Sequence, residues 1–128
     1  TNDRLIYCSI TGTGPTGPYR NRPAYDTVGQ GLGGMLSLLM DAKAPVPIGH
    51  NYADSLSGLF SCVGILGALV ARAQSGKGQE VTATMAGSIL GFLIAPATST
   101  LATGNIPGPY SRPISSQTYA FSASDVCS

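Results

Sequence analysis

The feature that most constrains this chain is an uncharged apolar segment, residues 56–71, that follows a single carboxylate, Asp54. A run of about 16 apolar and small residues is typical of a buried helix. An aspartate directly before such a helix can cap it, because its oxygens accept hydrogen bonds from the first free N–H groups. The same position suits a carboxylate nucleophile, which the helix N-terminus keeps ionised and whose developing oxyanion charge unpaired N–H groups can stabilise. The residues alone leave both roles for Asp54 open.

The composition argues against an electrostatic partner and against an isolated domain. Only 10% of the 128 residues are charged, where roughly 25% is usual, and the net charge is +1. Without a basic run, we expect no nucleic-acid partner. So few charges cannot solvate a whole surface, so we expect the chain to be cut at both ends from a larger protein, to be embedded in an oligomer, or to lie in a membrane.

The cysteines predict neither a metal site nor a disulfide framework. Cys8, Cys62 and Cys127 are far apart and odd in number, and no Cys-x-x-Cys spacing occurs. Buried, inert thiols in a reducing compartment are therefore expected, together with a cytoplasmic location, since the chain opens without a signal peptide.

The hydrophobic pattern predicts strands that alternate with buried helices. We expect strands at residues 4–10, 80–84 and 117–121, and helices at 27–40, 56–71 and 85–95, with a kink or stop at Pro96 and 98–103 as a candidate continuation. This order is typical of an α/β layer structure with a parallel sheet. The boundaries predict part of one domain over 1–104, followed by a proline-rich connector and the start of another element over 105–128.

Two glycine clusters stand at the ends of predicted elements. Gly12, Gly14 and Gly17 have the G-x-G-x-x-G spacing of a dinucleotide loop, but the prolines that follow prevent a helix before about residue 26. We therefore expect a ligand-edge loop rather than a dinucleotide site. The glycines at 29, 31, 33 and 34 fall within the predicted helix 27–40 and indicate close approach of another backbone or a ligand. Asp26 is expected to cap that helix.

A membrane hairpin is the alternative architecture. Residues 56–71 and 81–106 are both uncharged, and the turn between them carries Arg72 and Lys77. However, the first run is shorter than the roughly 18 residues that span a bilayer, Pro96 interrupts the second, and the mean hydropathy is only +0.18. We therefore prefer the α/β fold without a membrane span.

The order of these motifs resembles that of the family III CoA-transferases, the group that contains formyl-CoA, carnitine and bile-acid CoA-transferases. The similarity lies in the strand and glycine–proline loop of residues 4–19, the entry to the glycine-rich helix at 22–26, the Ala53-Asp54-x-x-x-Gly58 stretch, and the glycine turn 75–79 before a strand. Each motif alone is weak. Their order and spacing cover nearly the whole chain and together are specific.

The resemblance implies that Asp54 is the catalytic residue. In that family an aspartate attacks an acyl-CoA thioester to give a mixed anhydride and free CoA thiolate. The thiolate returns to form an aspartyl-CoA thioester, and a carboxylic acid then takes over the CoA. The resemblance further implies part of a large nucleotide-fold-like domain, acyl-CoA and carboxylic acid substrates, no permanently bound cofactor or metal, and an interlocked homodimer.

The resemblance also assigns candidate CoA-binding residues. Arg20 and Arg22 lie in the loop near the implied CoA channel, where they are candidate phosphate partners. Solvated loop charges are the alternative for both. Tyr25 and Asp26, at the start of the glycine-rich helix, complete the candidate CoA-binding set.

The related α-methylacyl-CoA racemases share the fold but move a proton. They place a histidine base where this chain has Tyr25, and tyrosine is a poor base at neutral pH, which favours transfer over racemisation. The single histidine, His50, is expected at the surface or in packing, with a contact to ligand or to Asp54 as the alternative.

Overall fold

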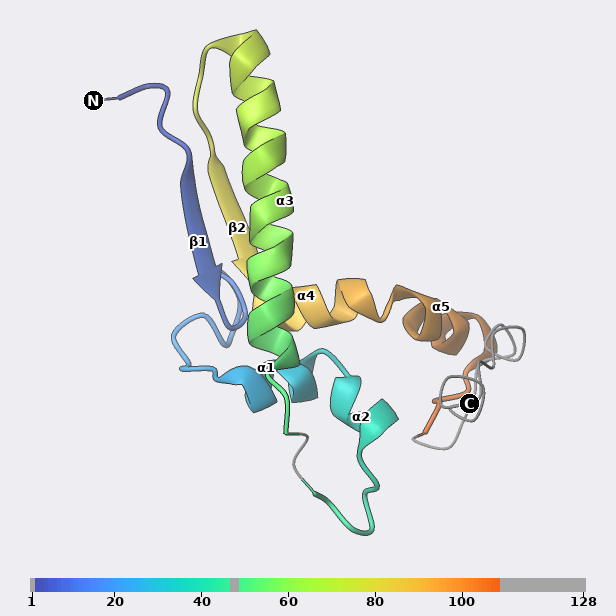
Figure 1. The fold of residues 1–128 in the computed structure, drawn as a ribbon. Helices are drawn as coiled ribbons and strands as arrows, with labels where there is room; N and C mark the ends of the chain where they lie inside the picture. The colour runs from blue at the N-terminus through green and yellow to red at the C-terminus, as the bar shows by residue number, and fades with distance from the viewer. Residues whose placement is uncertain (1, 47–48, 109–128) are drawn as a thin grey trace, which may run out of the picture.

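A computed structural model describes residues 2–46 and 49–108 of the chain (Figure 1). The elements follow one another as β1 (Tyr7–Thr11), α1 (Asp26–Leu32), α2 (Met35–Leu39), α3 (Tyr52–Ser75), β2 (Glu80–Thr84), α4 (Met85–Phe92) and α5 (Ile94–Thr103). The predicted α/β class is confirmed, and β2 has the predicted bounds. The predicted strand at 117–121 and most of the proline-rich connector lie outside the described residues.

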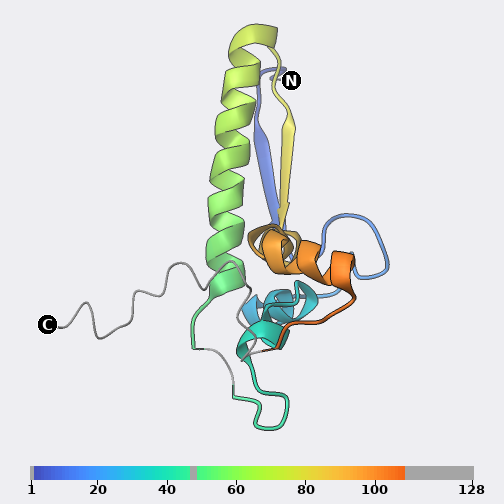
Figure 2. The ribbon, with the colours of Figure 1, turned by 90° about the vertical axis from the view of Figure 1, so that its right-hand side faces the viewer.

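The two strands form a parallel pair, with register from Tyr7 opposite Glu80 to Thr11 opposite Thr84. Parallel strands need a long crossover, and here α1, α2 and α3 supply it. Helix α3 runs alongside both strands in the opposite direction, so its N-terminus lies at their carboxyl ends (Figures 1 and 2). Helices α1 and α4 gather at the same end. This is the edge of a parallel sheet at which ligands of α/β proteins bind.

Small side chains let α3 approach its neighbours closely. The buried residues of this helix, at intervals of about one or two turns, are Ala53, Ser57, Ser61 and Ala68. The two serine hydroxyls donate to carbonyls one turn earlier, from Ser57 to Ala53 at 2.6 Å and from Ser61 to Ser57 at 2.7 Å. Their polar groups are thus satisfied within the helix, and the side facing β2 and α4 stays narrow.

Helix α3 is longer at both ends than the predicted segment 56–71. It begins at Tyr52, so Asp54 lies inside the helix rather than before it, and it ends at Ser75, where the C-cap residue Gly76 takes the left-handed φ of +73°. Hydrogen bonds fasten this end to the start of the chain: the Arg72 Nη1 donates to the Arg4 carbonyl at 3.0 Å, and the Arg4 Nη1 donates to the Gly76 carbonyl at 3.3 Å.

The core lies where α1, α2, α4 and the first turns of α3 meet, around Met35, Ala53 and Ile89. The prediction of close helix packing at the glycines is confirmed at two of them. A Cβ added at Gly29 would lie 2.9 Å from the Ala53 Cβ, and one added at Gly33 would lie 2.4 Å from the Ile89 Cβ. The predicted single helix 27–40 is divided into α1 and α2, because Gly34 takes a φ of +86°.

The break after α4 falls at Leu93, three residues before Pro96, and α5 leaves α4 at a bend of 74°. Pro96 lies in the first turn of α5, where a missing N–H is tolerated. In the described part of the chain, α3 is long and apolar enough to cross a membrane, and α4 with α5 would be a second candidate only as one bent span. The length objection to a membrane hairpin is therefore wrong for α3.

Many large apolar side chains remain exposed on the described part of the chain. On α3 they include Leu59, Val63, Leu66 and Val70. Cys62 is exposed on the same helix and Cys8 is half-buried, so the expectation of buried thiols is wrong for Cys62, while Cys127 lies outside the described residues. The low charge is thus matched by an apolar surface, as expected for a chain that is part of a larger protein, is embedded in an oligomer or lies in a membrane.

Candidate active site

Asp54 is the third residue of α3 and is exposed at the carboxyl end of the two strands. It does not cap the helix. Asn51 occupies the N-cap position, without a side-chain capping bond, and among residues 2–46 and 49–108 no donor bonds the Asp54 carboxylate. The structural interpretation of Asp54 as a cap is therefore wrong, and its carboxylate is free of that role.

The cap comes from another helix. The Asp26 Oδ1 accepts hydrogen bonds from the backbone N–H groups of Ala53 at 2.7 Å and Asp54 at 3.1 Å. Asp26 is the first residue of α1, yet the N-cap position of α1 is Tyr25, which makes no side-chain capping bond. The prediction that Asp26 caps its own helix is wrong. Its negative charge instead lies at the N-terminus of α3, where the helix dipole favours it.

The N–H groups of the four residues in the first turn of α3 are all hydrogen-bonded. Besides the two that Asp26 accepts, the N–H of Tyr52 donates to the His50 carbonyl and that of Ser55 donates to the Asn51 carbonyl, both at 3.1 Å. The expectation that free N–H groups stabilise oxyanion charge beside Asp54 is therefore wrong for the first turn, whereas the N–H of the N-cap residue Asn51 has no acceptor among the described residues. Stabilisation of such charge would have to come from other groups.

Gln30 holds the capping carboxylate and is a residue that the sequence interpretation missed. It is 1% exposed, and its Nε2 donates both to the Asp26 Oδ2 and to the His50 carbonyl, the latter at 3.0 Å. Its Oε1 is buried with no donor among the described residues. The available signal was the Asp26–Gln30 spacing of four residues in a helix of otherwise apolar and small residues.

His50 is exposed, and its ring meets the Tyr52 ring edge-on at 4.7 Å between centroids. This agrees with the interpretation of His50 as a surface or packing residue. Its carbonyl, rather than its imidazole, takes part in the hydrogen-bond network around Asp54.

The candidate CoA-binding residues are divided between two places. Tyr25, 78% exposed, and Asp26 lie at the start of α1, beside the first turn of α3. Arg20 and Arg22 are exposed in the loop that follows β1, where the Arg22 guanidinium lies 5.0 Å from the centre of the Tyr19 ring. Arg22 and Tyr19 also line a cavity of about 290 Å³. The assignment of these four residues to CoA binding stays a prediction.

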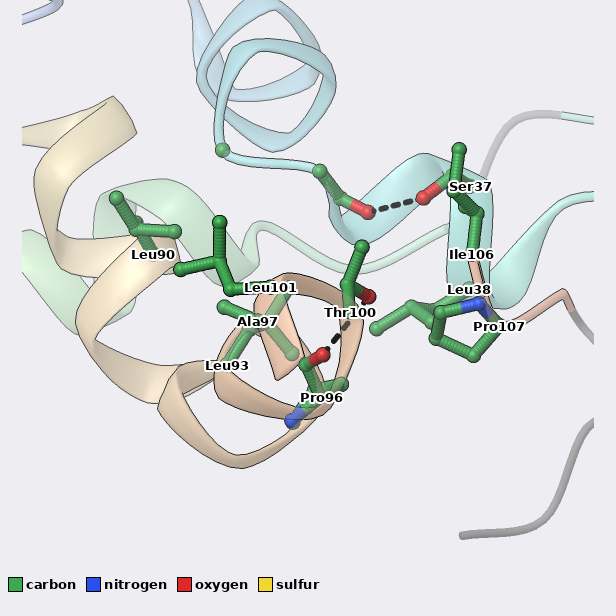
Figure 3. Close-up of a pocket in the computed structure, with 12 residues that line it drawn as sticks. Ser37, Leu38, Leu90, Leu93, Pro96, Ala97, Thr100, Leu101, Ile106 and Pro107 are labelled. Carbon is green, nitrogen blue, oxygen red and sulfur yellow. Dashed lines mark hydrogen bonds between the residues drawn. The ribbon is translucent and has the colours of Figure 1, made fainter. Parts of the chain in front are cut away.

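A larger cavity of about 370 Å³ lies between α2, α4, α5 and the segment after α5 (Figure 3). Its lining is mostly apolar, with Leu90, Leu93 and Leu101 on one side and Leu38 with Ile106 on the other. It includes none of the predicted site residues, so it gives Asp54 no substrate pocket. Among the described residues there is also no cluster of three or more His, Cys, Asp or Glu side chains that could hold a metal ion.

Comparison with known proteins decides the family. The model of CoA-transferase family III matches residues 1–126. The chain belongs to this family. It is 41% identical over 90 residues to the succinyl-CoA–L-malate CoA-transferase beta subunit of Chloroflexus aurantiacus, covering 69% of this chain and 22% of that protein. It is 37% identical over 120 residues to the acetyl-CoA:oxalate CoA-transferase of Acetobacter aceti, covering 88% and 31%.

The fold matches a solved structure of the family as well. A CAIB/BAIF family protein from Brucella suis aligns with 84% of this chain and 29% of its own, at a TM-score of 0.77 and 42% identity. The chain thus spans between a fifth and a third of the length of these relatives. The resemblance seen in the motifs is confirmed. A shared α/β fold also gives the apolar α3 a place in a domain, which favours that interpretation over a membrane hairpin.

Proposed function

We propose that the protein transfers CoA from an acyl-CoA donor to a carboxylic acid acceptor, and that Asp54 forms the covalent intermediates. Family membership supports the reaction class. The observation that carries the role of Asp54 is the cap from Asp26, because it satisfies the start of α3 and leaves an exposed Asp54 carboxylate without a structural task.

The chemistry follows from a carboxylate placed against a thioester. An Asp54 oxygen attacks the thioester carbon, the C–S bond breaks, and CoA leaves as a thiolate with a mixed anhydride on Asp54. The thiolate then attacks the Asp54 carbonyl carbon, releases the donor acid as a carboxylate, and leaves an aspartyl-CoA thioester. The acceptor carboxylate attacks this thioester, which breaks the C–S bond, expels the CoA thiolate and gives a second mixed anhydride on Asp54. The thiolate then attacks the acceptor carbonyl carbon, which forms the acceptor acyl-CoA and releases the Asp54 carboxylate.

Oxyanion charge in these steps needs donors outside the first turn of α3, since Asp26, His50 and Asn51 already accept its N–H groups. For the CoA phosphates we propose Arg20 and Arg22, because guanidinium groups bind phosphate oxygens in bidentate fashion. Tyr25 completes the proposed contacts with the thioester end.

The assembly is proposed as a cytoplasmic homodimer. The support is the row of exposed apolar side chains on α3, including Val63 and Leu66 at 60% and 56% exposure, which need cover from the remaining protein or a second subunit.

The test is to trap the intermediate in the full protein. After incubation with acyl-CoA, hydroxylamine should convert Asp54, and no other aspartate, to a hydroxamate that peptide mass spectrometry detects. Asp54→Asn should lower kcat by roughly 10³-fold or more, whereas Asp3→Asn, at an exposed aspartate near the chain start, should not change it. Full turnover in Asp54→Asn would refute the proposal. Deuterium exchange at the α-carbon of a 2-methylacyl-CoA, without CoA transfer, would indicate a racemase instead.

A further inference from the structure

We infer that Gln30 is a positioning residue for Asp54, an inference that rests on the proposed function. Gln30 lies in α1 and is almost completely buried, so we do not expect its side chain to contact a substrate directly. It would act through Asp26, because Gln30 binds the Asp26 Oδ2 while the Asp26 Oδ1 accepts the backbone N–H of Asp54.

The side-chain amide of Gln30 joins two segments that are far apart in the sequence. One Nε2 group donates to the Asp26 Oδ2, one turn earlier in α1, and to the His50 carbonyl, 20 residues later in the loop before α3. An amide has two such hydrogens, and each finds an acceptor. Helix α1, the loop and the first turn of α3 therefore form one hydrogen-bonded unit, with Asp54 at its end.

The chemistry of position 30 points to this role rather than to packing alone. A methionine would fill the same elongated buried space without leaving Oε1 buried and unpartnered among the described residues. A glutamate would present oxygens to the two acceptors that now receive hydrogens. Of glutamine, methionine and glutamate, only glutamine has an NH₂ group that donates to both Asp26 and His50.

Loss of the amide has a specific consequence for the nucleophile. An Asp26 carboxylate that is no longer oriented from Oδ2 binds the Ala53 and Asp54 N–H groups less well. An acidic side chain at the third helical position can itself reach back to the N-cap N–H group. Asp54 would then take over part of the capping, and its carboxylate would turn away from the thioester.

The test compares Gln30→Met with a matched control, Gln74→Met, at an exposed glutamine in the last turns of α3. In the full-length protein, Gln30→Met should lower kcat by about 10- to 100-fold, as expected for a displaced reacting group, while KM changes by less than about threefold. The Gln74→Met variant should keep both constants. The rate at which hydroxylamine-trappable acyl-enzyme appears should fall in parallel with kcat.

A double-mutant cycle separates positioning from general damage. If Gln30 acts through Asp54, Gln30→Met should cause no further loss of the residual rate in an Asp54→Asn background. An equal loss in both backgrounds would contradict the inference, as would a kcat for Gln30→Met equal to that of Gln74→Met. If instead Asp54→Asn alone retains full turnover, the proposed function fails and not only the role of Gln30.

A measurement on the unmodified protein covers the case in which Gln30→Met does not fold. Amide hydrogen exchange should show protection at Ala53 and Asp54, whose N–H groups Asp26 accepts. Exchange at the rate of unbonded amides at both positions would overturn the inference.

Discussion

Gly29→Ala is expected to damage both the stability and the activity of the protein. A Cβ at this position would lie 2.7 Å from the Met85 Cβ and 2.9 Å from the Ala53 Cβ. Carbon atoms prefer about 3.5–4.0 Å, so the two neighbours must retreat by at least about 0.6–0.8 Å. Neither contact is the flexible end of a long side chain, because both atoms are attached directly to a backbone. The strain must therefore move α3 or α4.

The size of the effect follows from two opposing contributions. Overpacking of a core costs about 1–3 kcal/mol, and replacing a helical glycine by alanine returns up to about 1 kcal/mol. A net loss of about 1–2 kcal/mol in the free energy of unfolding is expected. Because Ala53 precedes Asp54, a shift of the first turn of α3 should also lower kcat, by up to about 100-fold for a displacement near 1 Å.

The assay is denaturant unfolding of the full-length protein, combined with steady-state CoA transfer. Gly31→Ala is the matched control in the same helix, because its added methyl meets only the end of the Leu36 side chain, at 3.4 Å. The control should be as stable as the unmodified protein or slightly more so. If Gly29→Ala matches it in both stability and kcat, the packing of α1 against α3 described above is wrong.

Two further predictions concern the elements around the sheet. Thr84→Ala removes the side-chain oxygen that accepts from the Gly87 N–H at the start of α4, and should lower the free energy of unfolding by about 1 kcal/mol in denaturant titration, whereas Thr84→Ser should not. Gly78→Ala places a Cβ 1.8 Å from the Leu5 carbonyl oxygen. It should lower the free energy of unfolding by about 3 kcal/mol or more, which a lower denaturant midpoint of unfolding would show. Gly67→Ala, with nothing within 4 Å, serves as its control, and equal midpoints for these two glycine variants would contradict that close approach.

Local features of the chain could be predicted from the sequence because short-range sterics fix them. The alternation in residues 80–84 gave β2, and the prolines before Asp26 delayed α1 to the predicted residue. The glycines of α1 signalled close packing because few other demands explain their cost in a helix. The family could be predicted from the order of the motifs, because related proteins keep motif order through common ancestry.

The start of α3 could not be predicted from its own residues. It begins four residues earlier than the apolar run because Asp26, 28 residues before Asp54, supplies the cap. Tertiary packing decides which carboxylate caps α3, so local rules left the role of Asp54 open and assigned Asp26 to the wrong helix. The exposure of Cys62 is a similar case, since burial depends on protein that lies outside this chain's own contacts.

The fastening of α3 at both ends makes it a strut of about 36 Å, given its 24 residues. Arg72, about 27 Å along the axis from Asp54, ties one end to the chain start, and Asp26 ties the other to α1. A change in the last turn of α3 therefore affects the position of the Asp54 carboxylate by tilting or sliding the whole helix. Substitutions at Arg72 should therefore lower the thermal stability together with the activity that depends on Asp54. Substitutions at Asp26 should lower that activity while most of α3 keeps its position.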